Sequence, residues 1–367
     1  MNTKAAIQKA ALSRFTRTLF IGDIQGELSL FKRLLDAACF CAADALVLTG
    51  DLIEKGRRNL DTLRFVMQLM KNGNVWCVAG NCETELLARL EPENAEDLKL
   101  YMKLRRPNNS LLWDMSAEAG LDDLYEQDTF AFQREIKRIF APELHFLRAL
   151  PSIVESEDCI AVHAGLEQTD LSALTQKSCV RQTAWLKQDG PRFEKTVIVG
   201  HWPTVLYDRS RINANPRYSA RRNAFAIDGG CMIHEDGQLN CLIRHNRTGC
   251  WGYISCDALP RATVLQPQTA RSGTCFLWGD NAVEILSTHG SFSRCRHRRT
   301  GTEADIPTSL LYSAADGMHA SNFTTAELAL QPGDTVSVFL TTENGYYIKK
   351  NGISGWYRGA LRFPYPE

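Results

Sequence analysis

Apolar positions in the first 245 residues alternate between short runs typical of buried strands and the three-to-four spacing of amphipathic helices. The runs Thr18–Ile21, Ala45–Leu48 and Val75–Ala79 predict three strands, and helical spacing over residues 29–38 and 60–70 predicts the helices between them. Later strand candidates are Cys159–Val162, Val197–Val199 and Phe225–Ile227. This alternating order predicts a layered α/β domain.

Two further stretches differ from this domain in their pattern of apolar and polar residues. Residues 84–150 are helical and polar in pattern, and we interpret them as a helical insertion over one end of the sheet. From about Gly249 onward the pattern changes to short strands separated by turns. We therefore predict a first domain over residues 1–247 and an all-β region over residues 248–367.

The all-β region contains a weak internal repeat. Gly279-Asp280 and the apolar alternation after it resemble Gly333-Asp334 and the strand that follows. The later copy resembles a bacterial SH3-type small barrel, so two tandem barrels are predicted over about 250–313 and 326–367. Some such barrels bind peptides through aromatic residues. A peptide partner near Trp356-Tyr357 is one hypothesis, and core packing of these two side chains is the alternative.

Composition narrows the class of protein. The 367 residues contain 42 basic and 42 acidic side chains, so the formal charge is 42 − 42 = 0, with 44% apolar and 23% charged residues. These values are typical of a folded globular protein and argue against wholesale disorder. The zero balance argues against a general nucleic-acid binder. We interpret the basic run Arg294–Arg299 as a solvated face of the all-β region.

The sequence also predicts the compartment. Apolar stretches fall short of the roughly 20 residues that span a bilayer. The N-terminal segment does not resemble a signal peptide, because Thr16, Arg17 and Thr18 interrupt its apolar core. Without such a signal, the twelve cysteines indicate reduced thiols rather than a disulfide framework. We therefore expect a cytoplasmic protein that has no membrane partner.

Five polar clusters follow predicted strands. They are GDIQG at 22–26, GDLIEKG at 50–56, GNCE at 80–83, HAG at 163–165 and GHWP at 200–203. Because ligands of open α/β sheets bind beyond the carboxyl ends of the strands, these clusters can converge in space. Asp, Asn and His are ligands for divalent metals, and the glycines let the backbone turn sharply beside a metal or phosphate.

Taken in order, the clusters resemble the calcineurin-like metallophosphoesterases, in particular the bacterial branch of phosphoprotein phosphatases and symmetrical diadenosine tetraphosphatases. The family pattern is GDxHG, GDxxDRG, GNHE, HAG or HGG, and GH. The later stretch AIDGG at 226–230 also resembles that branch, and the resemblance covers about residues 16–245. It implies a four-layer αββα sandwich.

The resemblance implies a centre of two divalent metals, with Mn²⁺ the first candidate and Fe, Zn or Mg as alternatives. The implied metal ligands are Asp23, Gln25, Asp51, Asn81, His163 and His201. Asp51 would bridge the metals, with Asp23 on the first and Asn81 and the two histidines on the second. A hydroxide held between the metals would hydrolyse a phosphomonoester, phosphodiester or phosphoanhydride. The substrate would be a phosphorylated protein or a nucleotide.

The sequence departs from the family pattern in three places, one at the first metal site and two near the leaving group. Gln25 stands where a metal-binding His is usual, and Cys82 stands where the His that protonates the leaving group is usual. Glu54-Lys55 replaces the usual Asp-Arg pair. The residues that would carry catalysis are Asp51, Asn81, Cys82 and Glu54, and those that would bind substrate phosphate are Lys55, Arg57 and Arg181.

These departures bear on the substrate. General acid catalysis contributes typically 10²–10⁴-fold, and a thiol is a weak hydrogen-bond donor. A serine or threonine phosphate needs that acid most, whereas an anhydride or activated ester leaves without it. The sequence therefore favours anhydrides or activated esters. The alternative is a weakened pseudo-phosphatase that binds a phospholigand and holds a partner through the SH3-like region.

Overall fold

The computed structural model describes residues 3–105 and 109–364 of the chain. It contains two compact units. The first comprises the described residues up to 203, together with 216–233 and 239–256, and the second comprises 204–215, 234–238 and the described residues from 257 onward. The predicted boundary at residue 247 stays a prediction.

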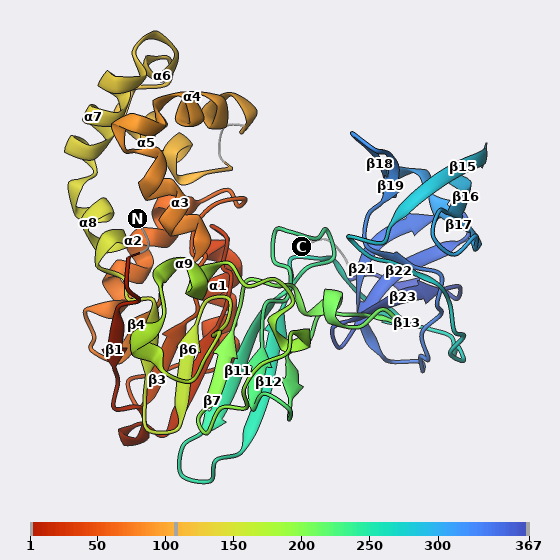
Figure 1. Cartoon of the computed structure of the whole chain (residues 1–367). Helices are drawn as coiled ribbons and strands as arrows, with labels where there is room; N and C mark the ends of the chain where they lie inside the picture. The colour runs from red at the N-terminus through yellow and green to blue at the C-terminus, as the bar shows by residue number, and fades with distance from the viewer. Residues whose placement is uncertain (1–2, 106–108, 365–367) are drawn as a thin grey trace. The chain divides into compact units, whose positions relative to one another are not determined.

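Two sheets form the centre of the first unit (Figure 1). One runs in the order β1 (Ile7–Lys9), β5 (Ile153–Glu155), β6 (Cys159–Val162), β7 (Thr196–Val199), β10 (Ala224–Ala226) and β9 (Arg217–Ser219). The other runs β12 (Trp251–Cys256), β11 (Leu239–His245), β2 (Arg17–Ile21), β3 (Asp44–Leu48) and β4 (Val75–Cys77). Within them, β2–β3–β4 and β6–β7–β10 are parallel.

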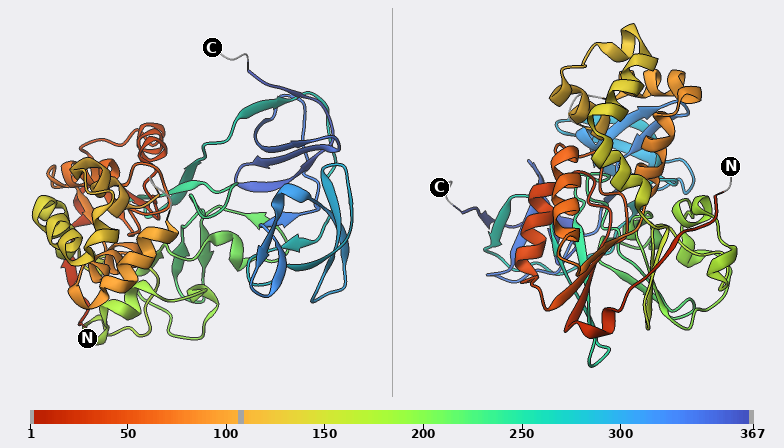
Figure 2. Two further views of the ribbon diagram at one scale, coloured as in Figure 1. Left: turned by 90° about the horizontal axis from the view of Figure 1, so that it is seen from above. Right: turned by 90° about the vertical axis from the view of Figure 1, so that its left-hand side faces the viewer.

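The layering follows from the period-two alternation of side chains along each strand. Leu19 and Ile21 of β2 belong to the core beneath the helices α1 (Leu28–Ala37) and α2 (Asn59–Met70). Phe20, between them, belongs to the core shared by the two sheets. Every residue of β3 is buried, as expected of a parallel strand covered on both faces. The short helix α9 (Gln176–Val180) lies on the outer side of the other sheet (Figure 2). The predicted layered α/β fold is confirmed.

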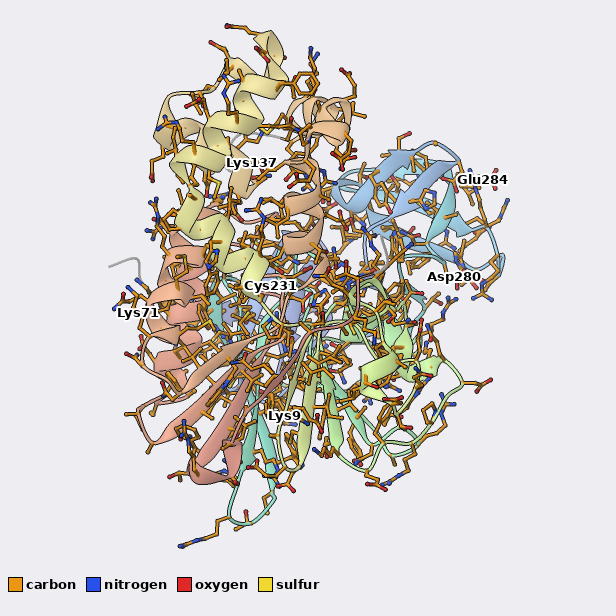
Figure 3. All side chains as sticks on the ribbon, turned by 60° about the vertical axis from the view of Figure 1, so that its left-hand side comes forward. Lys9, Lys71, Lys137, Cys231, Asp280 and Glu284 are labelled. Atoms are coloured by element: carbon orange, nitrogen blue, oxygen red, sulfur yellow. The ribbon has the colours of Figure 1, made fainter. Side chains whose placement is uncertain are left out.

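Most of the described residues between 81 and 149 lie in helices, as the polar helical pattern predicts. The helices are α3 (Asn81–Arg89), α4 (Ala95–Leu104), α5 (Leu111–Ala119), α6 (Leu124–Gln127), α7 (Thr129–Ile139) and α8 (Ala141–Ala149). Side-chain caps mark two of their starts: Ser110 accepts from the Trp113 N–H, and Asp128 accepts from the Ala131 N–H. These helices lie beyond the carboxyl ends of the strands, and Figure 3 labels Lys137 on α7.

The second unit is rich in antiparallel strands. They are β8 (Ile212–Asn213), β13 (Arg261–Val264), β14 (Cys275–Phe276), β15 (Ala282–His289), β16 (Phe292–His297), β17 (Glu303–Pro307), β18 (Leu311–Ala314), β19 (Gly317–Ala320), β20 (Phe323–Thr324), β21 (Thr335–Thr342), β22 (Gly345–Lys350), β23 (Ile353–Tyr357) and β24 (Leu361–Arg362). The larger sheet runs β24-β13-β21-β22-β23-β8, so β13 pairs with strands far along the chain. The SH3-like architecture, the tandem division and the peptide partner stay predictions.

Three smaller features of the chain complete the description. Arg294 and Arg296 of the basic run form ion pairs with acidic neighbours, Glu303 among them, as expected of a solvated face. All twelve cysteines lie in described residues and are free thiols. Among the helices of residues 3–105 and 109–364, none is both long enough and apolar enough to cross a membrane.

Candidate functional site

The five polar clusters converge at the carboxyl ends of adjacent strands, as the sequence predicts. Asp23 follows β2, Asp51 follows β3, Asn81 begins α3 just after β4, His163 follows β6 and His201 follows β7. One ligand atom each from Asp23, Asp51 and His163 lies within 4.8 Å of the others. Asn81 and His201 join this group, since Asn81 Oδ1 lies 3.0 Å from His163 Nε2 and the two histidine rings are 5.0 Å apart. We call these five residues the metal-ligand cluster, after the role that the sequence predicts for them.

Strained backbone marks these loops. Of the eleven non-glycine residues with positive φ in the described chain, six belong to the predicted site: Asp23 (42°), Gln25 (53°), Asp51 (50°), Glu54 (79°), Lys55 (63°) and His201 (65°). Each such residue costs of order 1–3 kcal/mol, and such conformations persist only where the surroundings enforce them. The concentration of strain here is typical of a functional site.

Two glycines allow the loops to approach this closely. A Cβ on Gly80 would lie 2.2 Å from Asp51 Oδ1, and a Cβ on Gly200 would lie 2.1 Å from Asp23 Oδ1. Neither position tolerates a larger residue without moving a carboxylate of the cluster. The glycines in GNCE and GHWP are therefore explained by close approach.

Glu83, which the sequence motif contains but to which we assigned no role, ties two of the loops together. Its fully buried carboxylate accepts the N–H groups of Gly80 (2.7 Å), Asp51 (3.0 Å) and Leu52 (2.8 Å). Burial, with the charge of Asp51, raises the pKa of Glu83 to about 7. Three backbone donors on one carboxylate fix the position of Asp51 relative to the start of α3.

The tautomer of His163 makes this cluster suitable for a cation. Its Nδ1 lies 2.7 Å from the carbonyl oxygen of Thr49, which can only accept, so the proton of the neutral ring belongs on Nδ1. The lone pair of Nε2 then faces Asn81 Oδ1 at 3.0 Å and Asp51 Oδ1 at 3.4 Å. Three lone-pair atoms converge with no proton between them. A divalent metal satisfies all three.

Crowded carboxylates lead to the same conclusion. Burial raises the pKa of Asp23 well above its usual value, and the negative charges of Asp228 and Asp51 raise it further. Asp228 follows β10 and is fully buried. Its Oδ1 accepts the Gly230 N–H at 2.7 Å, while its Oδ2 has no hydrogen-bond partner. Buried carboxylates at this density are expected to be paired or to bind a metal. The donor set therefore fits divalent metals, as predicted; the identity of the metal stays a prediction.

The two remaining predicted ligands have distinct environments. Burial and the nearby His163 lower the pKa of His201 to about 4, so its imidazole is neutral near pH 7, as a ligand requires. The Gln25 amide is fully buried, and its Nε2 donates to Asp51 Oδ2 at 3.0 Å. Gln25 therefore lies beside Asp51 with its amide nitrogen toward that carboxylate, and its role as a metal ligand stays a prediction.

Beside the cluster lie the residues that depart from the family pattern. The Cys82 thiol is buried, and burial raises its pKa well above the usual value, so it stays protonated. The Lys55 ammonium lies 4.0 Å from Cys82 Sγ. Burial by itself lowers the pKa of Lys55, but electrostatic interactions with Cys82, Asp51 and Asp23 together outweigh burial and raise it. The positively charged Lys55 side chain therefore lies beside a neutral Cys82 thiol.

Glu54 is predicted to act in catalysis, but its carboxylate accepts hydrogen bonds from residues of the helices α4 and α5. Its buried carboxylate accepts the hydroxyl of Tyr101 on α4 and, at 3.2 Å, the N–H of Leu111 at the start of α5. Burial raises the pKa of Glu54, although these donors oppose the rise. Glu54 thus joins the second motif to the helices; its role in catalysis stays a prediction.

The predicted phosphate-binding arginines differ in placement. Arg57 is exposed. Arg181 ends α9, whose Cys179 carbonyl accepts the N–H of Ala164 beside His163. The positive charge of Arg181 also contributes to the lowered pKa of His201, so its guanidinium lies within electrostatic reach of the cluster. Arg181 is therefore the better placed of the two.

Sequence reasoning missed Asp228 and Glu83 as members of the site. Both lie in stretches already identified as motif-like, AIDGG and GNCE. For Asp228 the available signal was a carboxylate close behind a strand, and for Glu83 it was membership of the motif. The same end of the unit holds Cys231, labelled in Figure 3, whose thiol donates to the Ile24 carbonyl at 3.9 Å.

Comparison with known proteins agrees with this geometry. The calcineurin-like phosphoesterase family model matches residues 16–226. Symmetrical bis(5'-nucleosyl)-tetraphosphatases are 46% identical over 72 residues in Buchnera aphidicola and 30% identical over 177 residues in Haemophilus influenzae. These matches cover 19% and 47% of this chain and 25% and 52% of those proteins, so the chain spans at most about half of these relatives. A solved metallophosphoesterase from Sphaerobacter thermophilus is 16% identical, with a TM-score of 0.38, and the match covers 66% of this chain and 89% of that one.

Proposed function

Because the chain belongs to the calcineurin-like phosphoesterase family, we propose that it hydrolyses phosphoanhydrides or activated phosphoesters with the help of divalent metals. The observation that carries the proposal is the convergence of lone pairs at His163 Nε2, Asn81 Oδ1 and Asp51 Oδ1. Metals bound there would polarise phosphoryl oxygens and lower the pKa of a bound water. Asp23, Asp51, Asn81, His163 and His201 would hold them, and we propose Mn²⁺ as the first candidate.

Other residues of the chain bind the substrate phosphate and position the metal ligands. Arg181 and Lys55 bring positive charge to the edge of the cluster and bind the oxygens of the transferred phosphate. Glu83 holds the Asp51 loop against the start of α3, so the ligands are placed before substrate arrives. The helices of residues 81–149 lie over the same strand ends (Figure 1).

The substrate class follows from the leaving-group side of the site, by which we mean Glu54, Lys55 and Cys82. Cys82 is a neutral and weak donor, and Glu54 is bonded to Tyr101. A leaving group must therefore depart with little protonation, while the positive charge of Lys55 stabilises the negative charge on its departing oxygen. Nucleotides and phosphates leave in this way. Dinucleoside polyphosphates, the substrates named for the relatives, are the class that we propose.

The test measures phosphate or phenolate release with added Mn²⁺. Para-nitrophenyl phosphate, its diester and diadenosine tetraphosphate are each compared with wild type and Asp51→Asn. Loss of a shared ligand is expected to cost several kcal/mol, or about 10³-fold in rate. Equal rates for wild type and Asp51→Asn on every substrate would refute hydrolysis at this site. Retained metal binding without release would instead favour a protein that only binds its phospholigand.

A further inference from the structure

Glu85 lies one helical turn after Asn81 on α3 and contacts three polar groups around the site. Its Oε1 accepts Arg181 Nη2 at 2.6 Å and Asn81 Nδ2 at 3.4 Å. Its Oε2 accepts Arg89 Nη2 at 3.4 Å. The carboxylate therefore bridges a member of the metal-ligand cluster and the arginine at its edge.

The contact with Asn81 decides which end of the amide faces the cluster. A carboxylate can only accept, so the NH₂ end of Asn81 turns toward Glu85 and the carbonyl oxygen turns toward His163 Nε2. In the flipped amide, the carbonyl oxygen of Asn81 would oppose Glu85, and the NH₂ group would face the metal site. Only the observed orientation offers an oxygen ligand.

The contact with Arg181 orders a side chain that is otherwise half exposed. The Arg181 side chain is 51% exposed and extends from the end of a short helix. A long exposed side chain loses rotamer entropy when it binds a ligand, and a fixed partner removes part of that loss beforehand. Glu85 is itself held by Arg89, which also pairs with Asp97 at 3.0 Å and covers the Tyr101 ring at 4.3 Å.

We propose that Glu85 is a positioning residue that orients both the metal-binding oxygen of Asn81 and the phosphate-binding guanidinium of Arg181. The effect on substrate rests on the proposed function, whereas the effect on metal affinity does not. One carboxylate would thus link the affinity for metal to the affinity for the substrate's phosphate.

The experiment compares Glu85→Ala, Arg181→Met, the double variant and Asp97→Asn. The dissociation constant for Mn²⁺ is measured by calorimetry, and KM and kcat are measured with diadenosine tetraphosphate. Glu85→Ala is expected to weaken Mn²⁺ binding about 10-fold, the lower end for loss of a group that orients a ligand. The variant also loses the charged hydrogen bond between Glu85 and Arg181. KM is therefore expected to rise, and the factor by which it rises should exceed the factor by which kcat falls about 10-fold.

The other variants separate the two effects. Arg181→Met is expected to raise KM and leave Mn²⁺ affinity unchanged. The double variant is expected to have a KM close to that of Arg181→Met alone, because Glu85 acts on KM through Arg181. Asp97→Asn also loses an Arg89 partner but contacts neither Asn81 nor Arg181, so it is expected to match wild type.

The proposal is overturned if folded Glu85→Ala keeps both Mn²⁺ affinity and KM within about twofold of wild type. Should thermal denaturation show that Glu85→Ala is unfolded, Glu85→Gln decides instead, because it keeps the size and removes the charge. If wild type shows no turnover, the proposed hydrolysis fails, and the Mn²⁺ titrations alone still decide whether Glu85 orients Asn81.

Discussion

The metal-ligand cluster and the leaving-group side lie next to each other, yet their environments differ. In the cluster, Asp51 and His163 present lone pairs to a common point, and the surrounding backbone holds them there. On the leaving-group side, the Glu54 carboxylate accepts a hydrogen bond from Tyr101 on helix α4, and Cys82 is a buried neutral thiol. The first arrangement favours metal binding, whereas the second would, under the proposed function, offer a leaving group a cation rather than a proton.

The largest effect is expected from removing the carboxylate that holds the cluster loops. Glu83→Ala leaves three buried N–H groups without an acceptor, at about 1–3 kcal/mol each. We therefore expect a loss of at least about 3 kcal/mol in the free energy of unfolding, measured by urea denaturation. Glu83→Gln, which keeps one acceptor oxygen, should lose less. An unchanged unfolding midpoint in Glu83→Ala would show that the loops are held by other contacts.

A smaller effect, confined to the reaction, is expected from the cation beside the thiol. Lys55→Met removes a positive charge that would contact substrate phosphate, worth about 1.5–3 kcal/mol, or roughly 10–100-fold in kcat/KM. Stability should change little, because the change also removes a half-buried charge. The matched control is Lys71→Met at the exposed end of α2, which should behave as wild type. If both variants lose the same activity, Lys55 has no special role.

Tyr101→Phe is expected to act on stability through the helices. The change removes a hydroxyl donor from the buried carboxylate of Glu54, at about 1.5–3 kcal/mol. Tyr125→Phe is the control, because the Tyr125 ring is buried but its hydroxyl bonds the exposed Glu126. A similar loss of stability in both variants would contradict a special contact between Tyr101 and Glu54.

The burial of Glu54 and its contact with Tyr101 also make the free energy of unfolding depend on pH. Burial raises the pKa of Glu54 above its ordinary value, so between the ordinary and the raised pKa the folded protein binds more protons than the unfolded one. Its contribution to the free energy of unfolding therefore falls as pH rises through that window. Without the Tyr101 hydroxyl the pKa rises further, and the fall should be steeper in Tyr101→Phe. Urea midpoints from about pH 4 to about pH 8 measure both slopes.

The smallest effect is expected at Cys82. Because burial keeps the thiol protonated and it donates weakly, Cys82→Ala should keep kcat/KM within about threefold of wild type. Iodoacetamide should modify the exposed Cys39 before Cys82, as followed by mass spectrometry of the peptides. A loss of about 10²–10⁴-fold in Cys82→Ala, the size of general acid catalysis, would instead identify Cys82 as the proton donor.

Local patterns were enough to predict the central strands and the loops that follow them. Asp23, Asp51 and His163 could be found because each comes directly after a buried strand, and parallel strands bring such positions to one edge. The partner of Glu54 could not be found in this way. Tyr101 is 47 residues away on a helix whose docking depends on tertiary packing, and no local periodicity encodes it.

The contacts of Glu85 fall between these cases. Its spacing of four residues from Asn81 on a helix was visible in the sequence and favours contact. Its pairing with Arg181, 96 residues away, depends on how the end of α9 lies beside the His163 loop. Asp228 likewise could be noticed in its motif, but the burial and the neighbouring carboxylates that raise the pKa of Asp23 exist only in the folded site.

The contrast between the two sides of the site is tested most directly by the dependence of the wild-type rate on the leaving group. Mn²⁺-dependent hydrolysis is measured for a series of aryl phosphates whose phenols have pKa values rising to that of tyrosine, about 10. A metal cluster that works without a proton donor predicts a rate that falls steeply as the phenol pKa rises. A rate that is nearly independent of the phenol pKa would mean that a group in the site protonates the leaving oxygen, and would contradict the assignment of Cys82 and Glu54 to other roles.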